Sequence, residues 1–222
     1  MSKLSTSIPV IAIDGPSASG KGSVAELVAE ALGFHYLDSG AIYRIVAYAS
    51  QQQNIAWDHA AAIASLTSHL SIQFAQGEIL LNGTNITSAV RSEEMGRGAS
   101  EVAVHPAVRY ALLDLQKQFR QSPGLVADGR DMASVVFPDA ALKIFLTANV
   151  EVRAQRRFLQ LRNRGLDAHL ETILNDLQQR DFRDSQRSAA PLKQMLDALL
   201  LDTTERTIQE AVDFILNAYK KI

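Results

Sequence analysis

A nine-residue segment near the amino end has the residue types and spacing of a phosphate-binding loop. It reads Gly15, Pro16, Ser17, Ala18, Ser19, Gly20, Lys21, Gly22 and Ser23. The glycines of the pattern Gly-x-x-x-x-Gly-Lys let successive N–H groups turn onto a polyphosphate, and Lys21 can reach the outer phosphates. An apolar run, Val10 to Ile13, precedes the loop, and apolar residues recur at helical spacing from Val24 until Gly33. This strand–loop–helix context predicts a nucleotide-binding site rather than a glycine-rich turn that only joins two elements.

One position departs from the usual pattern. Gly22 stands where Ser or Thr normally follows the lysine, and the hydroxyl is displaced by one residue, to Ser23. Direct ligation of Mg²⁺ by that hydroxyl is therefore a weak expectation. We expect Mg²⁺ to be held mainly by substrate phosphates and water.

Arginine is concentrated in one part of the chain. Eight of the fifteen arginines lie between positions 153 and 187, and no lysine lies among them. They are Arg153, Arg156, Arg157, Arg162, Arg164, Arg180, Arg183 and Arg187. Guanidinium groups bind phosphate oxygens in a planar, two-pronged geometry, so this bias favours phosphate binding. The alternative is a solvated helix face, which the acidic residues of the same segment partly support.

Polar residues follow two apolar strands at the points where each strand ends. Asp128-Gly129-Arg130-Asp131 comes after one strand, where open α/β folds bind their ligands. Its carboxylates could serve a metal, a sugar or a base, and Arg130 a phosphate. The alternative is a turn in which an Asp caps the next element and the charges pair with each other. Ser39, Tyr43 and Arg44 follow another strand and have the same two interpretations.

These parts suit phosphoryl transfer to an acceptor that already carries phosphate. The pattern offers no Ser–His or Cys–His nucleophile, and no general base stands beside the loop. A phosphate acceptor needs no base, because its second ionisation near pH ~6 leaves it nucleophilic at neutral pH. Catalysis would then consist of alignment plus neutralisation of charge by Lys21, a metal and several arginines.

The elements that must position these residues alternate between strand and helix. Further strands are predicted at 34–37, 125–128, 142–146 and 198–202, with helical patterns between them. We expect two helical regions, one from about Arg91 to Gln121 that is interrupted at Pro106, and one from Val150 to Gln186. A last helix should begin with a capping box of Thr207 and Glu210. Such alternation predicts an α/β fold with a parallel sheet covered by helices on both faces.

One segment has a different character. Leu70, Ile72 and Phe74 alternate with polar residues, and Glu78 to Leu81 forms a second short apolar run. Asn82-Gly83, which follows, is a strong hairpin signal. We therefore expect a small antiparallel insert.

Composition excludes several classes of function. The 222 residues are 47% apolar and 21% charged, which is ordinary for a globular enzyme, and the net charge of −2 does not favour a nucleic-acid polymer or an anionic membrane. The absence of cysteine excludes disulfides and thiolate catalysis. We see no signal peptide or membrane-spanning run and no ligand-like spacing of the five histidines. A soluble, cytoplasmic monomer is the expectation.

Four motifs in order resemble one family. They are Gly15 to Ser23, Leu37-Asp38-Ser39-Gly40-Ala41-Ile42-Tyr43-Arg44, Ala127-Asp128-Gly129-Arg130-Asp131-Met132, and Arg180-Asp181-Phe182-Arg183-Asp184. Together they resemble the bacterial cytidylate kinases of the nucleoside monophosphate kinase superfamily, essentially from end to end. The Lys-Gly-Ser departure is itself typical of that superfamily. The resemblance implies transfer of the γ-phosphoryl group of ATP to CMP or dCMP, with Mg²⁺, in pyrimidine metabolism.

The resemblance also implies a lobe organisation. A single kinase domain, 1–222, would comprise a core of about 1–38, 122–150 and 167–222, and an acceptor-binding lobe of about 39–121. The antiparallel insert would span about 62–100 and a short helical lid about 151–166.

By matching positions, the resemblance implies roles for particular residues. Ser100, Arg109 and Asp131 resemble the cytosine-reading set, with Asp184 and Arg180 near the pentose. Ser39, Arg44, Arg130 and Arg187 would contact the acceptor phosphate and the transferred group. Arg153 and Arg157 would approach the donor phosphates. The implied catalytic set is Lys21, Arg130, Arg157 and Arg187.

Three other functions compete with this one. A regulatory GTPase would also have a phosphate loop, but the sequence contains neither Asp-x-x-Gly nor Asn-Lys-x-Asp. A kinase for another nucleotide or for a metabolite alcohol is a nearer alternative, although an alcohol would call for a positioned base. A nucleotide-binding module without turnover leaves the distal arginines unexplained.

Overall fold

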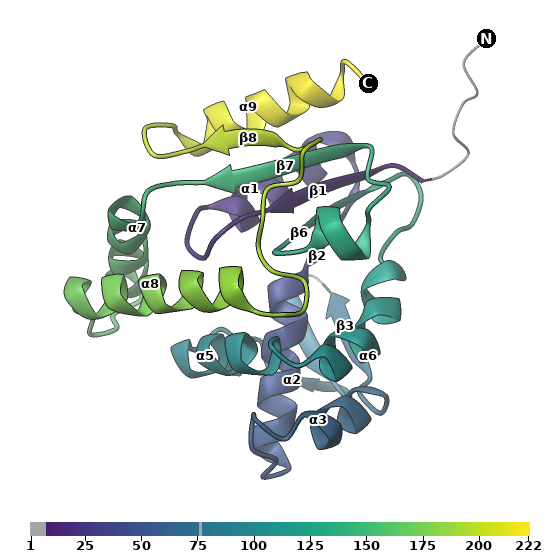
Figure 1. Ribbon diagram of the computed structural model, residues 1–222, viewed down its shortest axis with the longest axis vertical. Helices are drawn as coiled ribbons and strands as arrows, with labels where there is room; N and C mark the ends of the chain where they lie inside the picture. Colours follow the sequence, from purple (N-terminus) through teal and green to yellow (C-terminus); the bar gives the residue numbers. More distant parts are fainter. Residues whose placement is uncertain (1–7, 76) are drawn as a thin grey trace. The chain divides into compact units, whose positions relative to one another are not determined.

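The computed structural model describes residues 8–75 and 77–222 (Figure 1). In chain order its elements are β1 (Val10–Asp14), α1 (Lys21–Leu32), β2 (His35–Asp38), α2 (Ser39–Gln52), α3 (Ala60–Thr67), β3 (Ile72–Ala75), β4 (Glu78–Leu81), β5 (Thr84–Asn85), α4 (Thr87–Val90), α5 (Glu93–Val102), α6 (Pro106–Lys117), β6 (Leu125–Gly129), the π-helix η1 (Met132–Val136), β7 (Leu142–Thr147), α7 (Val150–Asn163), α8 (Leu170–Gln186), β8 (Leu199–Asp202) and α9 (Ile208–Tyr219). The chain divides into two compact units. Unit 1 comprises the described residues up to 37 together with 117–222, and unit 2 comprises 38–116.

Unit 1 is built on the predicted parallel sheet, whose five strands have the order β2-β6-β1-β7-β8. The central strand β1 pairs in parallel with β6 on one side and β7 on the other, and β7 pairs in parallel with β8. The ends of β1, β6 and β7 therefore lie at one edge of the sheet. The phosphate loop, the Asp128 to Asp131 segment and the start of α7 all leave from that edge.

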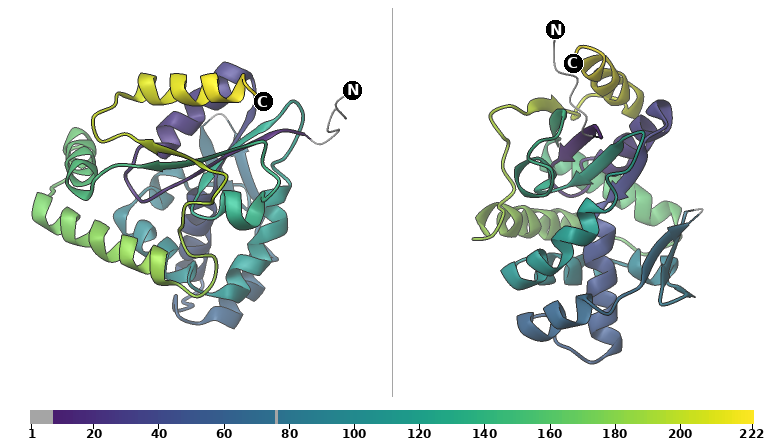
Figure 2. Two further views of the ribbon diagram at one scale, coloured as in Figure 1. Left: turned by 45° about the horizontal axis from the view of Figure 1, so that its top comes forward. Right: turned by 90° about the vertical axis from the view of Figure 1, so that its right-hand side faces the viewer.

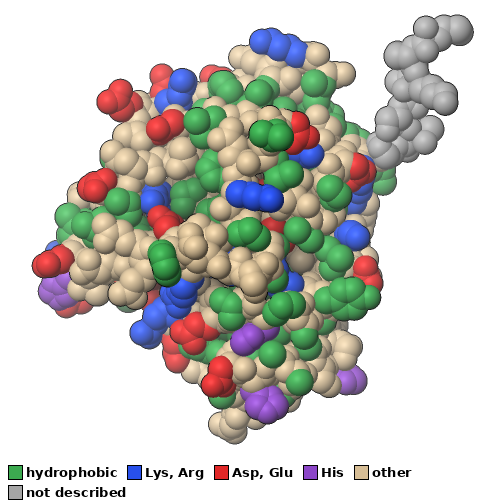
Figure 3. All heavy atoms as spheres, in the orientation of Figure 1, with side chains coloured by type: hydrophobic (Ala, Val, Ile, Leu, Met, Phe, Trp, Pro, Cys, Tyr) green, Lys and Arg blue, Asp and Glu red, His purple; other side chains and the backbone are tan. Residues whose placement is uncertain are grey.

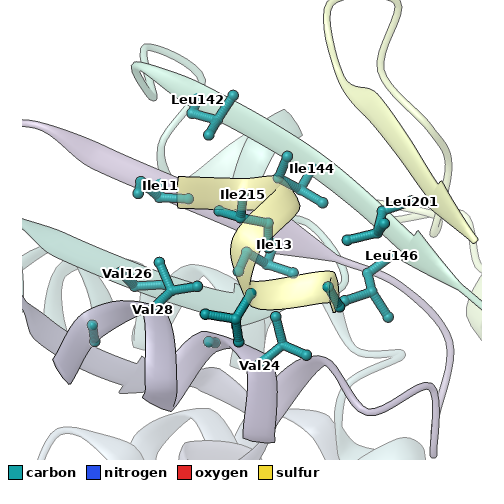
Figure 4. Packing of buried hydrophobic residues seen from close by; sticks show 14 residues of the cluster. Ile11, Ile13, Val24, Val28, Val126, Leu142, Ile144, Leu146, Leu201 and Ile215 are labelled. Atoms are coloured by element: carbon teal, nitrogen blue, oxygen red, sulfur yellow. The ribbon is translucent and has the colours of Figure 1, made fainter. Parts of the chain in front are cut away.

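Apolar residues from the sheet and two helices form the core of unit 1 (Figure 4). Ile11 and Ile13 of β1 pack with Val24 and Val28 of α1 and with Ile215 of α9, and all five side chains are buried. Because successive strand residues point to opposite faces, Asp14 points away from this core. On that opposite face, η1 lies against the end of β1, where its amides bond to Asp14.

The phosphate loop is fixed at its first glycine by close packing. A Cβ added to Gly15 would lie 1.9 Å from the carbonyl oxygen of Leu146 in β7, so no larger residue fits there. Gly20 has φ of 91° and caps the amino end of α1, a conformation that glycine adopts without steric cost. The apolar strand, the loop and the helix predicted from the sequence are thus confirmed.

The arginine-rich helices of unit 1, α7 and α8, lie between β7 and β8 in the chain. Figures 1 and 2 show α7 and α8 side by side. The predicted helix from 150 to 186 is interrupted between Asn163 and Leu170, where Gly165 has a φ of 73°. The predicted capping box is confirmed, since the Thr207 side chain accepts from the Glu210 amide and the Glu210 carboxylate accepts from the Thr207 amide.

Unit 2 contains the predicted antiparallel insert. Strands β3, β4 and β5 form a three-stranded sheet with both pairings antiparallel, and Asn82 and Gly83 at the second turn have positive φ values, as the hairpin signal implies. One apolar cluster joins Ile45 of α2, Leu66 of α3 and Ile79 of β4. Gly98 of α5 allows that helix to approach α2, because a Cβ there would lie 2.8 Å from the Cβ of Ala47 in α2 and 2.6 Å from the Trp57 ring.

Three local expectations differ from the structure. The helical region predicted from Arg91 begins earlier, as α4, and restarts at Glu93 because Ser92 caps α5 by accepting from the Met95 amide. Its last helix ends at Lys117 instead of continuing to Gln121. The π-helix after Asp131 was not predicted at all.

None of the helices in the described part of the chain is long and apolar enough to cross a membrane. The face shown in Figure 3 carries acidic and basic side chains interspersed.

The close packing at Gly15 generates a stability prediction. Gly15→Ala should lower the free energy of unfolding by about 3 kcal/mol or more, because the strand or the loop must move to relieve the clash. Gly22→Ala is the matched control, since its nearest neighbour, the Tyr36 hydroxyl, is 3.5 Å away. Urea unfolding of both variants measures the difference. Equal stability of the two would contradict the packing described at Gly15.

Candidate active site

The phosphate loop contacts two cationic side chains of unit 1, one buried and one partly buried. Lys21 is buried, and its Nζ donates to the Pro16 carbonyl oxygen at 3.1 Å, so its ammonium group lies over the loop. Arg130, which follows β6, donates from Nη2 to the Ser17 hydroxyl at 2.7 Å. The loop and the end of β6 are therefore joined through a guanidinium group.

Arg130 is paired with a carboxylate of α8. Its Nε donates to Asp184 Oδ2 at 2.7 Å, and the side chains are 15% and 7% exposed. Burial alone would raise the pKa of Asp184, but the charges of Arg130, Arg180 and Arg187 outweigh it and hold that pKa below its usual value. Burial would lower the pKa of Arg130, and the charge and hydrogen bond of Asp184 reverse this, so that its pKa is raised. Both groups are ionised at neutral pH.

Two arginines of α7 hold the backbone of the same loop. Arg153 is buried and donates from Nη1 to the Ser17 carbonyl oxygen at 3.1 Å and from Nη2 to Asp181 Oδ2 at 2.6 Å. Arg156 donates to the Ser19 carbonyl oxygen at 3.4 Å and to Thr203. The loop is thus held by guanidinium groups on the carbonyl oxygens of Ser17 and Ser19, which leaves its N–H groups for an anion.

Three further arginines predicted from the sequence lie on α7 and at α8, and the contacts seen for them are with other groups. Arg157 donates to the Gln160 side chain within α7. Arg187 donates from Nε to the Ala190 carbonyl oxygen at 2.7 Å, just beyond α8. Arg180 lies on α8, half-buried, and acts electrostatically on Asp184. Asp131 is buried at the start of η1.

Unit 2 holds four of the predicted site residues. Ser39 is buried as the first residue of α2, which Asp38 caps by accepting from the Ala41 amide. Arg44 lies on the same helix and donates from Nη1 to the carbonyl oxygens of Val90 and Ser92 at 3.1 and 2.9 Å. Its guanidinium group is thereby anchored at the junction of α4 and α5.

The other two residues lie on α5 and α6. Ser100 is 5% exposed, and its Oγ has no hydrogen-bond partner among the described residues. Arg109 is buried, donates to the Ala103 carbonyl oxygen, and lies over the Tyr43 ring with its Cζ 5.6 Å from the ring centroid. An unsatisfied buried hydroxyl is costly, so Ser100 Oγ is a group that a ligand would satisfy.

The side chains that could ligate a cation suit Mg²⁺ that is bound mainly through the phosphates of a substrate. Ser23 is exposed in the first turn of α1, and the described residues contain no group of three His, Cys, Asp or Glu side chains that could hold a metal. Mg²⁺ keeps several waters and needs few protein ligands when phosphates supply the others.

Comparison with known proteins decides the family. The family model described as cytidylate kinase matches residues 11–221. A cytidylate kinase from Polynucleobacter necessarius is 56% identical over 211 residues, covering 95% of this chain and 98% of its own. Another from Chromobacterium violaceum is 53% identical and covers 96% of both chains. The chain belongs to the cytidylate kinase family.

A solved structure agrees at the level of the fold. An uncharacterised protein from Eubacterium ventriosum matches this cytidylate kinase family member with a TM-score of 0.50 and 12% identity, covering 96% of this chain and 99% of its own. At that identity the likeness shows the fold alone.

Sequence reasoning missed several contacts of this site. Arg156, Asp181 and Thr203 bond to the loop or to the arginines that hold it, yet none was a candidate site residue. Spacing could have found Arg156, because positions 153 and 156 lie on one helix face. Thr203 has no such signal, since it reaches the Ser19 carbonyl oxygen from 184 positions away.

The buried Arg130–Asp184 pair generates a stability prediction. Asp184→Asn should lower the free energy of unfolding by about 3 kcal/mol at neutral pH, because it leaves a buried guanidinium group without its counter-charge. Chemical denaturation measures the difference. The folded-state pKa of Asp184 is depressed, so the difference should be complete at pH 7 and shrink as the pH falls below the unfolded value of 3.8.

A double variant is the control for this prediction. Arg130→Met with Asp184→Leu removes both charges and should be more stable than Asp184→Leu alone. The two single variants are Arg130→Met and Asp184→Leu. If the double variant lost as much stability as these two single variants together, the two groups would not be coupled.

Proposed function

We propose that this protein transfers the γ-phosphoryl group of ATP to CMP or dCMP, giving ADP and CDP or dCDP. Membership of the cytidylate kinase family supports the reaction. The observation that carries it is the buried set of Lys21, Arg130 and Arg153 around one phosphate loop. A loop that only bound a nucleotide would need no cation beyond its own amides and lysine. Arg130 adds a second cation, from the segment after β6, that can neutralise charge on a transferred phosphoryl group.

We assign the donor side to unit 1 and the acceptor-binding lobe to unit 2. ATP phosphates would lie against the loop amides, Lys21 and Arg153, with Arg157 approaching them. Ser39, Arg44, Arg130 and Arg187 would bind the acceptor phosphate. Arg44 is suited to this because the carbonyl oxygens of Val90 and Ser92 hold its guanidinium group in place.

Cytosine would be read by Ser100, Arg109 and Asp131. A carboxylate accepts from the exocyclic amino group, while guanidinium and hydroxyl groups serve the ring nitrogen and carbonyl oxygen. Uracil replaces the amino donor with a carbonyl oxygen, which a carboxylate repels. Arg180 and Asp184 would lie near the pentose. The buried Ser100 hydroxyl, which lacks a hydrogen-bond partner among the described residues, supports this assignment.

The chemical step needs no base from the protein. The acceptor phosphate is largely a dianion at neutral pH, so the protein's part is to align it and to neutralise charge with Lys21, Arg130 and Arg187. Mg²⁺, when bound, would neutralise donor phosphates, and we assign the Ser23 hydroxyl as the loop residue that would help to hold it. We assign residues of about 151–166, which comprise most of α7 and the turn that follows it, as a lid that excludes water.

The acceptor assignment is tested by comparing nucleotides. With ATP and Mg²⁺, ADP formation should be faster with CMP and dCMP than with UMP or AMP, because only cytosine has the donor and acceptor pattern described above. A coupled assay of ADP release measures all four rates. Equal rates would contradict the cytosine pocket, and faster transfer to an alcohol would favour the metabolite kinase.

The role of the loop lysine is tested by truncation. Lys21→Ala should lower kcat by about 100-fold or more, because it removes a charge that stabilises the transferring group. Its urea midpoint should stay near that of the wild type. Lys117→Ala, at an exposed end of α6, is the control and should keep full activity. Near-normal turnover by Lys21→Ala would contradict the role proposed for the phosphate loop in the transfer.

A further inference from the structure

The residue that follows β8 reaches the phosphate loop with a buried hydroxyl. Thr203 is 4% exposed. Its Oγ1 lies 3.2 Å from the carbonyl oxygen of Ser19 in the loop and 3.0 Å from that of Thr147 at the end of β7. Arg156 of α7 donates to the same hydroxyl from Nη1 at 3.2 Å, and to the Thr203 carbonyl oxygen from Nη2 at 2.5 Å. One hydroxyl therefore connects the loop with β7, with α7 and with the segment after β8.

The two carbonyl oxygens depend on this hydroxyl to different degrees. A hydroxyl has one proton, so Thr203 shares it between them. Thr147 also accepts from the Thr203 amide at 2.8 Å, and that bond needs no side chain. The other donor seen at the Ser19 carbonyl oxygen is Arg156, at 3.4 Å, which is longer than most hydrogen bonds of this kind. Loss of the hydroxyl would thus loosen Ser19 more than Thr147.

The direction of the Ser19 carbonyl group fixes an amide of the loop. In a trans peptide unit, the C=O group and the N–H group that follows it lie in one plane and point in opposite directions. With the Ser19 oxygen held toward Thr203, the Gly20 N–H points away from Thr203. Gly20 has a φ of 91° and caps the amino end of α1, where amides bind phosphate oxygens.

A second carbonyl group of the loop is held in a similar way. Arg153 donates to the Ser17 carbonyl oxygen at 3.1 Å, which by the same geometry directs the Ala18 N–H. Ala18 has a φ of 58°, a left-handed conformation that is uncommon for residues other than glycine. Two alternate peptide units of the loop are therefore turned by contacts from outside it, one of which is made by the Thr203 hydroxyl.

We propose that Thr203 is a positioning residue for the donor nucleotide: through the Ser19 carbonyl oxygen, its hydroxyl directs the Gly20 amide to a phosphate of ATP or ADP. This role rests on the proposed function, which places the donor phosphates on the loop. The competing view is that Thr203 only stabilises the junction of β7, α7 and the segment after β8.

Three substitutions separate these views. Thr203→Val keeps the shape of the side chain and removes the hydroxyl, whereas Thr203→Ser keeps the hydroxyl and removes a methyl group. Thr207→Val is the matched control, because it makes the same change in the same connecting segment. Thr207 bonds to Glu210 at the cap of α9 instead of to the loop, so its loss should destabilise the fold without turning a loop amide.

Calorimetric titration with ADP and Mg²⁺ measures donor binding without turnover. Thr203→Val should raise the Kd for ADP by about tenfold, because a hydrogen bond to a charged phosphate is misdirected. Its KM for CMP should change by less than about twofold. Thr203→Ser should keep the wild-type Kd for ADP. Thr207→Val should lower the urea midpoint and also keep that Kd.

The outcomes that contradict this role are distinct. A Kd for ADP in Thr203→Val within about twofold of the wild type would overturn it, and so would an equal rise in Thr207→Val or in Thr203→Ser. Failure of the wild type to bind ADP would overturn it as well. A wild type that binds ADP, responds to Thr203→Val as expected and does not phosphorylate CMP would overturn the proposed function and leave the role of Thr203 standing.

The wild type alone supplies a second measurement, in case Thr203→Val does not fold. In a proton–nitrogen correlation spectrum, the Gly20 amide proton should move downfield when ADP and Mg²⁺ are added, because a hydrogen bond to a phosphate oxygen deshields it. The Gly33 amide, which bonds to the Ala29 and Glu30 carbonyl oxygens at the other end of α1, is the internal control and should stay in place. A Gly20 signal that does not move while ADP binds would overturn the role of Thr203.

Discussion

The site of unit 1 depends on buried guanidinium groups whose charges are balanced by carboxylates. Arg130 and Arg153 both contact Ser17 of the phosphate loop, one at its hydroxyl and one at its carbonyl oxygen, and each is paired with a carboxylate of α8. Without Asp184 and Asp181, two positive charges would be buried beside Lys21. The carboxylates permit the arginines to stay desolvated and ordered around the place where an anion would bind.

This constraint explains why elements distant in the sequence must fold together. The loop leaves β1, Arg130 follows β6, and α7 and α8 supply the arginines and their counter-charges. The parallel pairing of β1 with β6 and β7 brings the first three to one edge of the sheet. Removal of one partner of either ion pair, Arg130–Asp184 or Arg153–Asp181, would leave the other charge uncompensated, so the site and the stability of unit 1 share these contacts.

Much of this could be predicted from local sequence, because the signals are local. The apolar run before Gly15, the capping box at Thr207 and the Asn82-Gly83 turn each depend on neighbours within a few positions, and all three are confirmed. The family resemblance is confirmed by the comparisons. The roles given to single site residues stay predictions.

What the sequence did not predict depends on contacts between distant segments. Nothing near Asp14 indicates that its carboxylate accepts from the first amide of a helix 118 positions later. The π-helix itself has no simple period in the sequence. Arg156 and Arg157 are adjacent and chemically identical, and only the direction of each side chain on α7 shows that Arg156 contacts the loop while Arg157 contacts Gln160.

In the function proposed above, these arginines and the loop transfer a phosphoryl group between nucleotides without losing it to water. Phosphorus NMR of a mixture of protein, Mg²⁺, ATP and CMP follows every phosphate directly. We expect the γ-phosphate signal to decline while the signals of ADP and CDP grow in equal amounts and inorganic phosphate stays low. Accumulation of inorganic phosphate with CMP unchanged would contradict it.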